Sequence, residues 1–220
     1  MRLPPGTRIR TGAILFDMDG TLIDSSATIE RIWRRWAGRH GIDADALMDF
    51  AVGRRLTETI RRFAVPGMDV ADEAMAIDAD ARAATDGVVA VPGADAFLRS
   101  LPDDRWAVVT SAPTAIARRW LAAARLPMPR VFVAAEDVSA GKPDPEGYRL
   151  ALARLDRSAE EAVVFEDTVS GLEAGRAAGA RTIAIAASLG ASDRVREPWI
   201  ASFSDVAVEA DADVLTIVVR

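Results

Sequence analysis

The spacing of hydrophobic residues separates a helical segment from the rest of the chain. Between residues 24 and 88, apolar side chains recur every three or four positions, which is typical of helices with one buried face. The clearest stripe comprises Ile29, Ile32, Trp33, Trp36 and Ala37. Gly41 is expected to end that helix, and further helices are expected over 45–52, 56–63 and 70–85.

After residue 91 the pattern changes to short apolar runs that alternate with helical stretches. The expected strands are 106–110, 131–133, 162–165 and 182–185, and the expected helices are 92–101, 114–124, 145–155 and 169–178. Such alternation predicts a parallel sheet that helices cover on both faces. The tail, 205–220, is expected to form a β-hairpin around Asp211-Ala212-Asp213.

The two patterns together predict an α/β fold: a Rossmann-like doubly wound parallel sheet with a small helical cap inserted after its first strand. The core is expected to comprise residues 1–23 and 89–220, and the cap residues 24–88. Ligands of open α/β sheets bind beyond the carboxyl ends of the strands. A cap inserted there is placed to close over a site and to exclude water.

Composition narrows the class of partner. The 220 residues carry 27 basic and 33 acidic side chains, a net charge of −6, so no basic surplus favours nucleic acid or an anionic membrane. No stretch approaches the ~20 apolar residues of a membrane span, and the first residues lack the apolar core of a signal peptide. With no cysteine, disulfides are excluded. We expect a cytoplasmic protein, a monomer or homodimer, that acts on a small molecule.

Two carboxylates stand one residue apart where the first apolar run, 13–16, ends. Asp17 and Asp19 precede a turn at Gly20, and alternate residues of an extended segment share a face, so both can reach the space beyond the strand. Like charges this close repel unless a cation or a proton lies between them. Hard carboxylate oxygens favour Mg²⁺, and one histidine without cysteine offers little to a softer metal. The alternative is an acidic turn without a ligand.

The single lysine of the chain, Lys142, is the next candidate. Of the 27 basic residues the other 26 are arginine, which suggests that arginine cannot replace this one. An ammonium group is a compact charge that enters a crowded pocket, whereas a guanidinium is a broad planar fork. Lys142 lies in the Gly/Pro-rich loop 140–145, which leads into a helix expected to begin near Pro145.

Two further expected strands end in polar residues. Thr110 and Ser111 follow one strand, where a hydroxyl and backbone N–H groups can bind a phosphate oxygen, although helix capping is an equally physical reading. Glu166 and Asp167 end another strand and point to opposite faces, so Asp167 is expected to ligate the metal. Glu166 is expected to lie behind it and orient a bound water.

These residues follow four expected strands of one parallel sheet, whose carboxyl ends converge. The combination fits phosphoryl transfer, which depends on positioning and on neutralising phosphoryl oxygens. Asp17 would be the nucleophile that forms an aspartyl-phosphate, and Asp19 the general acid and base. Mg²⁺ would be held by Asp17, the main-chain carbonyl of Asp19 and Asp167, while Lys142 would offset the remaining negative charge.

The motifs resemble those of the haloacid dehalogenase superfamily over essentially the whole chain. The strings that carry the resemblance are Phe16-Asp17-Met18-Asp19-Gly20-Thr21, Val91-Pro92-Gly93-Ala94, Trp106-Ala107-Val108-Val109-Thr110-Ser111, Gly141-Lys142-Pro143-Asp144-Pro145 and Val163-Val164-Phe165-Glu166-Asp167. Within the superfamily the chain looks most like the sugar- and polyol-phosphate phosphatases, including the 2-deoxyglucose-6-phosphate and glycerol-phosphate phosphatase group. The resemblance implies the same roles for Asp17, Asp19, Thr110, Lys142 and Asp167.

One departure lies in the expected cap. Val52-Gly53-Arg54 stands where relatives often carry His-Gly followed by a basic or polar residue, so the substrate does not carry over with the resemblance. Gly53 and Arg54 are the candidate substrate-facing residues of the cap. A solvated arginine at the start of a helix, beside Arg55, is the alternative.

The sequence therefore predicts a Mg²⁺-dependent phosphatase for a small phosphorylated sugar or polyol. A phosphosugar mutase of the β-phosphoglucomutase type shares the core motifs and is the main alternative. A haloacid dehalogenase proper usually lacks the second carboxylate, so Asp19 disfavours it. A non-catalytic binding module is disfavoured because Asp17, Asp19, Lys142 and Asp167 are all present.

Overall fold

A six-stranded parallel sheet forms the centre of the computed structural model, which describes residues 1–51, 54–186, 197–211 and 214–220. Its strands are β2 (Ala13–Phe16), β5 (Trp106–Val109), β6 (Val131–Val133), β7 (Ala162–Glu166), β8 (Arg181–Ile185) and β9 (Trp199–Ile200). The strand order is β6-β5-β2-β7-β8-β9, so the chain winds outward from β2 in both directions. This is the doubly wound α/β sheet that the sequence predicts, and its topological switch lies at β2.

Helices cover both faces of this sheet. They are α5 (Ala94–Arg99), α6 (Thr114–Ala123), α7 (Glu146–Leu155) and α8 (Val169–Ala178). Successive residues of β2 face opposite sides: Phe16 packs in one apolar cluster with residues of α5 and α6, and Leu15 packs in another with residues of α7 and α8. Because both faces are buried, the strands read as continuous apolar runs rather than as alternating ones.

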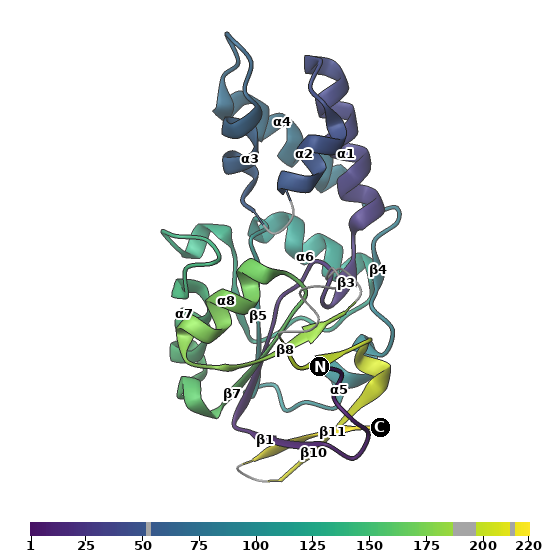
Figure 1. Ribbon diagram of the computed structural model, residues 1–220, viewed down its shortest axis with the longest axis vertical. Coiled ribbons are helices and arrows are strands. Elements are labelled where there is room, and N and C mark those ends of the chain that lie inside the picture. The colour runs from purple at the N-terminus through teal and green to yellow at the C-terminus, as the bar shows by residue number, and fades with distance from the viewer. Residues whose placement is uncertain (52–53, 187–196, 212–213) are drawn as a thin grey trace.

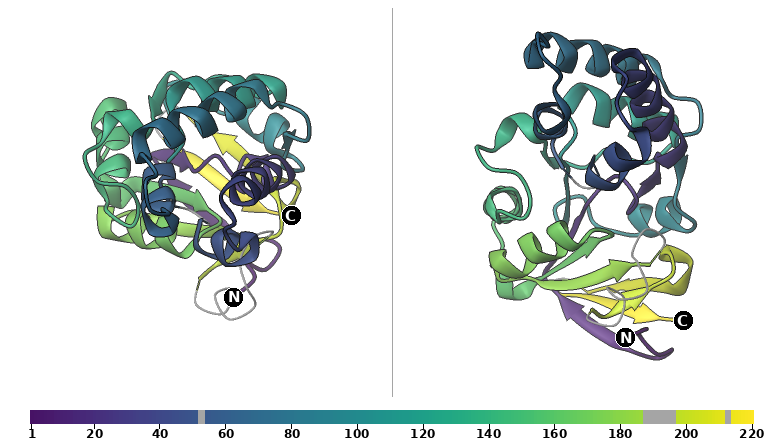
Figure 2. Two further views of the ribbon diagram at one scale, coloured as in Figure 1. Left: turned by 90° about the horizontal axis from the view of Figure 1, so that it is seen from above. Right: turned by 45° about the horizontal axis from the view of Figure 1, so that its top comes forward.

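Four helices stand above the carboxyl ends of the strands (Figures 1 and 2). They are α1 (Ser26–His40), α2 (Ala44–Ala51), α3 (Leu56–Phe63) and α4 (Val70–Ala83). The chain enters them from β3 (Ile23–Asp24) and leaves through β4 (Val89–Ala90), and these two short strands pair antiparallel. The helix that Gly41 ends is confirmed. The expected domain boundaries of the cap at residues 24 and 88 stay predictions.

The helices above the sheet also touch the core through α6. The indole Nε1 of Trp120 donates to the carbonyl oxygens of Ala81 and Ala84, at 3.2 and 2.9 Å. Both carbonyls belong to the last turn of α4 or the residue after it, where a helix has unpaired carbonyls to offer. Trp120 thus satisfies the end of α4 and fixes it against the core.

A small antiparallel sheet lies at the opposite end of the molecule (Figure 1). It consists of β1 (Arg8–Thr11), β11 (Leu215–Val219) and β10 (Val206–Ala210), with β11 in the middle. The hairpin expected over 205–220 is confirmed in its two strands, and residues 212–213 of its turn lie outside the described residues. The sequence pattern does not predict β1, because the strand that pairs with it lies some 200 residues further along the chain.

Some helix boundaries differ from the expected ones. The helix expected over 92–101 is shorter, Ala94–Arg99, because Gly93 before it has a φ of +83° that cannot belong to a right-handed helix. The helix expected over 70–85 ends at Ala83. Short 3-10 helices occupy Ala135–Asp137, Ala159–Glu161 and Phe203–Asp205.

Within the described residues, no helix combines the length and apolar character needed to cross a membrane.

Gly93 lies where the backbone before α5 meets the 3-10 helix Phe203–Asp205. A Cβ on Gly93 would stand 2.5 Å from the carbonyl carbon of Phe203, so no side chain fits between the two segments. Phe203 is buried among Phe16, Phe97 and Phe165, with ring centroids 5.2 to 5.7 Å apart. The close approach thus holds the C-terminal segment against the aromatic core below β2.

The substitution Gly93→Ala is therefore expected to destabilise the protein strongly. Gly67→Ala is the matched control, because Gly67 has a similar φ of +86° but nothing within 4 Å of an added Cβ. The control should lose about 1 kcal/mol of unfolding free energy for the left-handed backbone alone, and Gly93→Ala clearly more. Urea denaturation followed by circular dichroism measures both, and equal losses would contradict the packing argument.

Candidate active site

The carboxyl ends of the central strands bring the predicted polar residues together. Asp17 follows β2 directly, Thr110 follows β5, and Glu166 is the last residue of β7. Lys142 lies in the loop that connects β6 to α7. Apart from Glu166, which is fully buried, these side chains face a common cavity beneath α1 to α4.

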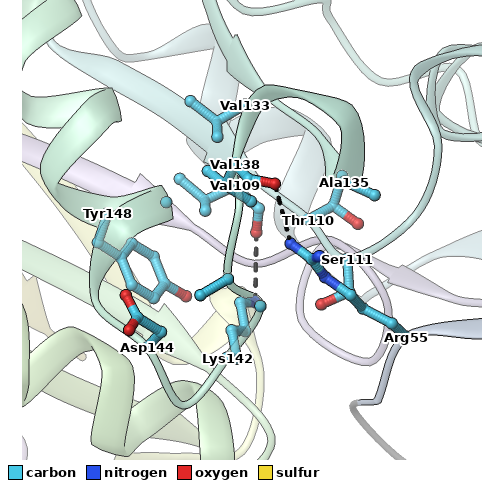
Figure 3. A pocket seen from close by; sticks show the side chains of 13 residues that line it. Arg55, Val109, Thr110, Ser111, Val133, Ala135, Val138, Lys142, Asp144 and Tyr148 are labelled. Atoms are coloured by element: carbon cyan, nitrogen blue, oxygen red, sulfur yellow. Dashed lines mark hydrogen bonds between the residues drawn. The ribbon is translucent and has the colours of Figure 1, made fainter. Parts of the chain in front are cut away.

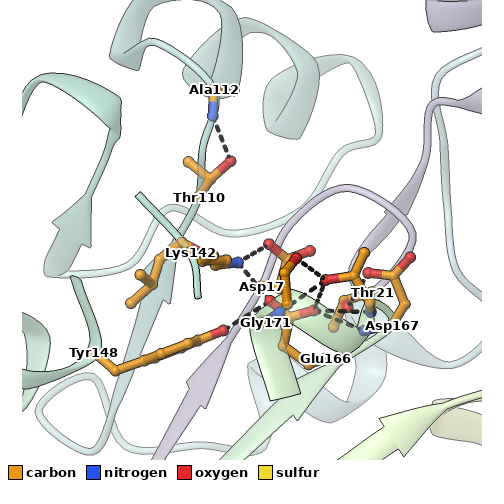
Figure 4. A network of polar contacts seen from close by, with 12 residues as sticks. Asp17, Thr21, Thr110, Ala112, Lys142, Tyr148, Glu166, Asp167 and Gly171 are labelled. Atoms are coloured by element: carbon orange, nitrogen blue, oxygen red, sulfur yellow. Dashed lines mark hydrogen bonds and ion pairs between the residues drawn. The ribbon is translucent and has the colours of Figure 1, made fainter. Parts of the chain in front are cut away.

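The ammonium group of Lys142 sits between two carboxylates (Figure 4). Its Nζ lies 2.5 Å from Oδ1 of Asp17 and 2.5 Å from Oε1 of Glu166. It also donates to the main-chain carbonyl of Val109 at 3.3 Å (Figure 3). Only 7% of the Lys142 side chain is exposed. The three donors of an ammonium group match three acceptors in a space with little room, which supports the size argument made for this single lysine.

Glu166 is held in place from several sides. Its Oε1 accepts a hydrogen bond from the hydroxyl of Tyr148 at 3.0 Å. Its Oε2 accepts from the backbone N–H groups of Asp167 and Thr168 and from the Thr168 hydroxyl, at 3.0 to 3.1 Å. A Cβ on Gly171 in α8 would overlap the Glu166 carboxylate, so the glycine makes room for it. The expected role of Glu166 in orienting a water stays a prediction, and its contacts give it a second task, fixing Lys142.

The other two carboxylates contact hydroxyl groups. Oδ1 of Asp19 accepts a hydrogen bond from Ser25 at 2.6 Å, and Oδ1 of Asp167 accepts one from Thr21 at 3.2 Å. Both hydroxyls belong to the segment that leads from β2 to α1. The loop after Asp17 therefore supplies one carboxylate of the site and orients another.

The site carries more negative than positive charge. Oxygen atoms of Asp17, Glu166 and Asp167 lie within 4.8 Å of one another, and Asp19 lines the same cavity. Among the described residues of this cluster, Lys142 supplies one positive charge against these four carboxylates. Hard oxygen donors with an unbalanced negative charge fit a divalent cation. The residues present thus fit the metal expected from the sequence.

Burial shifts the pKa values of the two aspartates that follow β2. Burial, together with the charge of Glu166, raises the pKa of Asp17 to about 7, although Lys142 opposes the shift. Burial raises the pKa of Asp19 to about 6, against the opposing hydrogen bond from Ser25. Burial lowers the pKa of Lys142, but Asp17 and Glu166 outweigh it and raise that pKa well above its usual range, so the amine stays charged.

The cavity above the site has a volume of about 400 Å³. Asp17, Asp19, Thr110, Ser111, Lys142 and Asp167 line its lower end. The Thr110 hydroxyl accepts a hydrogen bond from the N–H of Ala112 at 3.0 Å, which shapes the turn after β5. Arg54, the candidate residue of the cap, also lines the cavity, and its guanidinium lies 4.5 Å from the ring centroid of Phe50. Gly53 lies outside the described residues.

Arg55 makes a contact that the sequence does not predict. From the start of α3 it reaches down to the loop that carries Lys142 and donates to the carbonyl oxygens of Val138 and Ser139, both at 3.3 Å. A Cβ on Gly141 would lie 2.6 Å from the Nε of Arg55, so the glycine leaves room for the guanidinium. Arg54 and Arg55 are adjacent and alike in sequence. Nothing in the sequence around Gly141 and Lys142 indicates a contact with α3. The sequence therefore gives no signal that distinguishes Arg55 from Arg54.

Most of the chain is similar to known proteins. The family model of the haloacid dehalogenase-like hydrolases matches residues 11–179. The chain is 39% identical to hexitol phosphatase A of Escherichia coli, covering 80% of this chain and 84% of that protein. It is 35% identical to 2-deoxyglucose-6-phosphate phosphatase 1 of Saccharomyces cerevisiae, covering 79% of each. The crystal structure of CbbY from Rhodobacter sphaeroides in complex with phosphate superposes with a TM-score of 0.74 at 26% identity, covering 89% of this chain and 96% of that one.

The family match spans most of the chain, and the curated relatives are named phosphatases. The chain therefore belongs to the haloacid dehalogenase-like hydrolases.

Proposed function

We propose that this hydrolase is a Mg²⁺-dependent phosphatase that cleaves a small phosphorylated sugar or polyol through an aspartyl-phosphate on Asp17. The observation that carries the proposal is the contact of Asp17 with Lys142 at the base of a cavity that Asp19 and Asp167 also line. The relatives named for hexitol and 2-deoxyglucose-6-phosphate support the class of substrate.

The residues divide the reaction into two displacements at phosphorus. A carboxylate oxygen of Asp17 attacks the phosphorus atom, the bond to the alcohol oxygen breaks, and Asp19 donates a proton to the departing alcohol. Water then attacks the phosphorus of the aspartyl-phosphate, Asp19 takes its proton, and inorganic phosphate leaves while the Asp17 carboxylate is restored. A pKa of about 6 lets Asp19 act as acid and as base near neutral pH.

Other residues bind and orient the phosphoryl group. Lys142 places its positive charge beside the attacking oxygen, and Thr110 and Ser111 offer hydroxyl and backbone groups from the end of β5. Asp17, the main-chain carbonyl of Asp19 and Asp167 would hold Mg²⁺, which when bound supplies positive charge to the phosphoryl oxygens. Residues 24–88 would act as a cap, with Arg54 facing the substrate. The cytoplasmic location and the monomeric or homodimeric state stay predictions.

The first test is phosphate release from sugar and polyol monophosphates with Mg²⁺ present. Asp17→Asn is expected to lower turnover at least 1,000-fold, because an amide is a poor nucleophile at phosphorus. Asp156→Asn is the matched control: Asp156 is exposed at the end of α7, and asparagine accepts its left-handed φ of +54°. Near-normal turnover by Asp17→Asn would refute the role. Turnover that requires added bisphosphate would favour the mutase.

A variant that keeps the charge of Lys142 but enlarges its head group tests whether the size of the ammonium group matters. Lys142→Arg is expected to lower kcat/KM at least 100-fold although it keeps the charge, because the planar guanidinium does not fit between Asp17 and Glu166. The reverse exchange Arg119→Lys, at an exposed position of α6, should leave kcat/KM unchanged. Steady-state kinetics of both purified variants decide the point, and normal turnover by Lys142→Arg would remove the size argument.

The raised pKa values predict how pH acts on the metal-free protein. The folded state keeps the Asp19 proton up to about pH 6, whereas the unfolded chain releases it near the ordinary pKa of 3.8. Unfolding free energy should therefore fall between about pH 4 and 6, by about 1–3 kcal/mol for this partly exposed group. Asp19→Asn should flatten the decline in EDTA-treated protein, measured by urea denaturation.

The same linkage applies to metal binding, because protons compete for the carboxylates. Added Mg²⁺ should raise the thermal unfolding midpoint more at pH 8 than at pH 5. An equal rise at the two pH values would contradict binding to these carboxylates.

A further inference from the structure

The two adjacent arginines at the start of α3 lie in different surroundings. Arg54 is exposed and lines the large cavity above the strand ends, whereas Arg55 is half-buried and is not part of that lining. Arg55 lines a separate hollow of about 20 Å³, the space of about one water, together with Thr110, Ser111 and Lys142. Its guanidinium thus lies beside the residues proposed to bind the phosphoryl group, but it does not face the space for the substrate.

The guanidinium of Arg55 binds main chain rather than carboxylates. Its two terminal nitrogens donate to the carbonyl oxygens of Ser139 and Val138, both at 3.3 Å, and Figure 3 shows the bond to Val138. Among the residues that the structure describes, Arg55 forms no ion pair. A planar fork of N–H donors can hold two successive carbonyls at once, which a single ammonium group does less well. The side chain is therefore bound to the loop that leads to Lys142.

Glu146 of α7 binds the N–H groups of the same loop. Its carboxylate accepts hydrogen bonds from the backbone N–H groups of Ser139 and Ala140 and from the Ser139 hydroxyl, at 2.7 to 3.0 Å. These bonds lower the pKa of Glu146, and the nearby charge of Arg55 adds to the shift. The main chain just before Lys142 thus has its carbonyls bound by a cation and its N–H groups bound by an anion.

Gly141 leaves open the space that the Arg55 side chain fills. The nearest atoms to a Cβ on Gly141 would all belong to Arg55, with Nε at 2.6 Å and Cδ at 3.2 Å. The φ of Gly141 is not positive, so its backbone conformation is open to an alanine. The contact with Arg55 is therefore what a side chain at position 141 would disturb.

We propose that Arg55, in the space left by Gly141, is a positioning residue that holds the main chain of 138–139 and so fixes Lys142 for the chemical step, without touching the substrate. This inference rests on the proposed phosphatase function. Only two residues separate Ser139 from Lys142, so movement of the bound carbonyls reaches the ammonium group. The Lys142 Nζ lies 2.5 Å from Oδ1 of Asp17. A misplacement of about 1 Å in such a contact can cost about 100-fold in rate.

Substitutions on α3 provide the first test. Arg55→Ala is expected to lower kcat about 10-fold with little change in KM, because Lys142 stabilises charge that develops in the transition state. Arg55→Lys can still reach one carbonyl and should lose only about threefold. Arg61→Ala is the matched control, since Arg61 is exposed on the same helix, and its kcat should not change. Steady-state phosphate release with Mg²⁺ measures all three variants.

The dependence on substrate separates positioning from direct contact. Arg55 would act on the phosphoryl group, which all substrates share, so the loss in Arg55→Ala should agree within about twofold for a polyol phosphate and a hexose phosphate. Arg54→Ala should instead change the ratio of kcat/KM for the two esters, because Arg54 lines the cavity. A loss in Arg55→Ala that varies with the alcohol would show direct contact with the substrate and would overturn the positioning role.

A double-mutant cycle tests the space that Gly141 and Arg55 share. Gly141→Ala is expected to lower kcat as far as Arg55→Ala, because the added Cβ takes the place of Nε. The double variant should be no slower than Arg55→Ala alone, since both changes remove the same contact. Losses that multiply would show that the two residues act separately, which contradicts the proposal.

The outcomes distinguish this inference from the function on which it rests. If the wild type releases phosphate from no sugar or polyol monophosphate with Mg²⁺, the proposed function fails and the inference with it. If the wild type is active and Arg55→Ala keeps the kcat of Arg61→Ala, the phosphatase stands and the positioning role is wrong. Circular dichroism gives the folded fraction of each variant, to which its kcat is referred.

Discussion

The position of one ammonium group between two buried carboxylates is the constraint on which the rest of the site depends. Lys142 contacts Asp17 and Glu166, which come from two neighbouring strands, so the amine fixes the distance between their ends. A buried charge without partners would be costly, and here each member is compensated by the others. The remaining excess of negative charge is what a divalent cation would neutralise.

The fold serves this arrangement by holding Glu166 rigidly. Tyr148 of α7, the backbone after β7 and the missing side chain at Gly171 of α8 all define where its carboxylate lies. Both helices belong to the face of the sheet opposite the aromatic cluster around Phe16. Packing on that face therefore positions Lys142, although neither Tyr148 nor Gly171 is expected to touch the substrate.

Contacts between α1 to α4 and the core connect the walls of the cavity to the loop that carries Lys142. Trp120 binds the end of α4, and Arg55 binds the backbone just before Lys142. The upper helices therefore supply much of the wall of the cavity, and they also support the loop that carries Lys142. The walls of the cavity and the position of Lys142 thus depend on the same packing contacts.

The sequence alone determined the sheet class, the alternation of strands and helices over 106–185, and the polar residues at the strand ends, because these follow from local periodicity and from residue chemistry. The pair of Asp17 and Asp19 and the single Lys142 can be recognised without knowing which distant residues they contact. Only the tertiary structure decided which groups meet, since Lys142 and Asp17 are 125 residues apart, and Arg55 and Val138 are 83 residues apart. The pairing of β1 with β11 and the contact of Trp120 with the end of α4 were likewise decided by folding, because neither leaves a local signal in the chain.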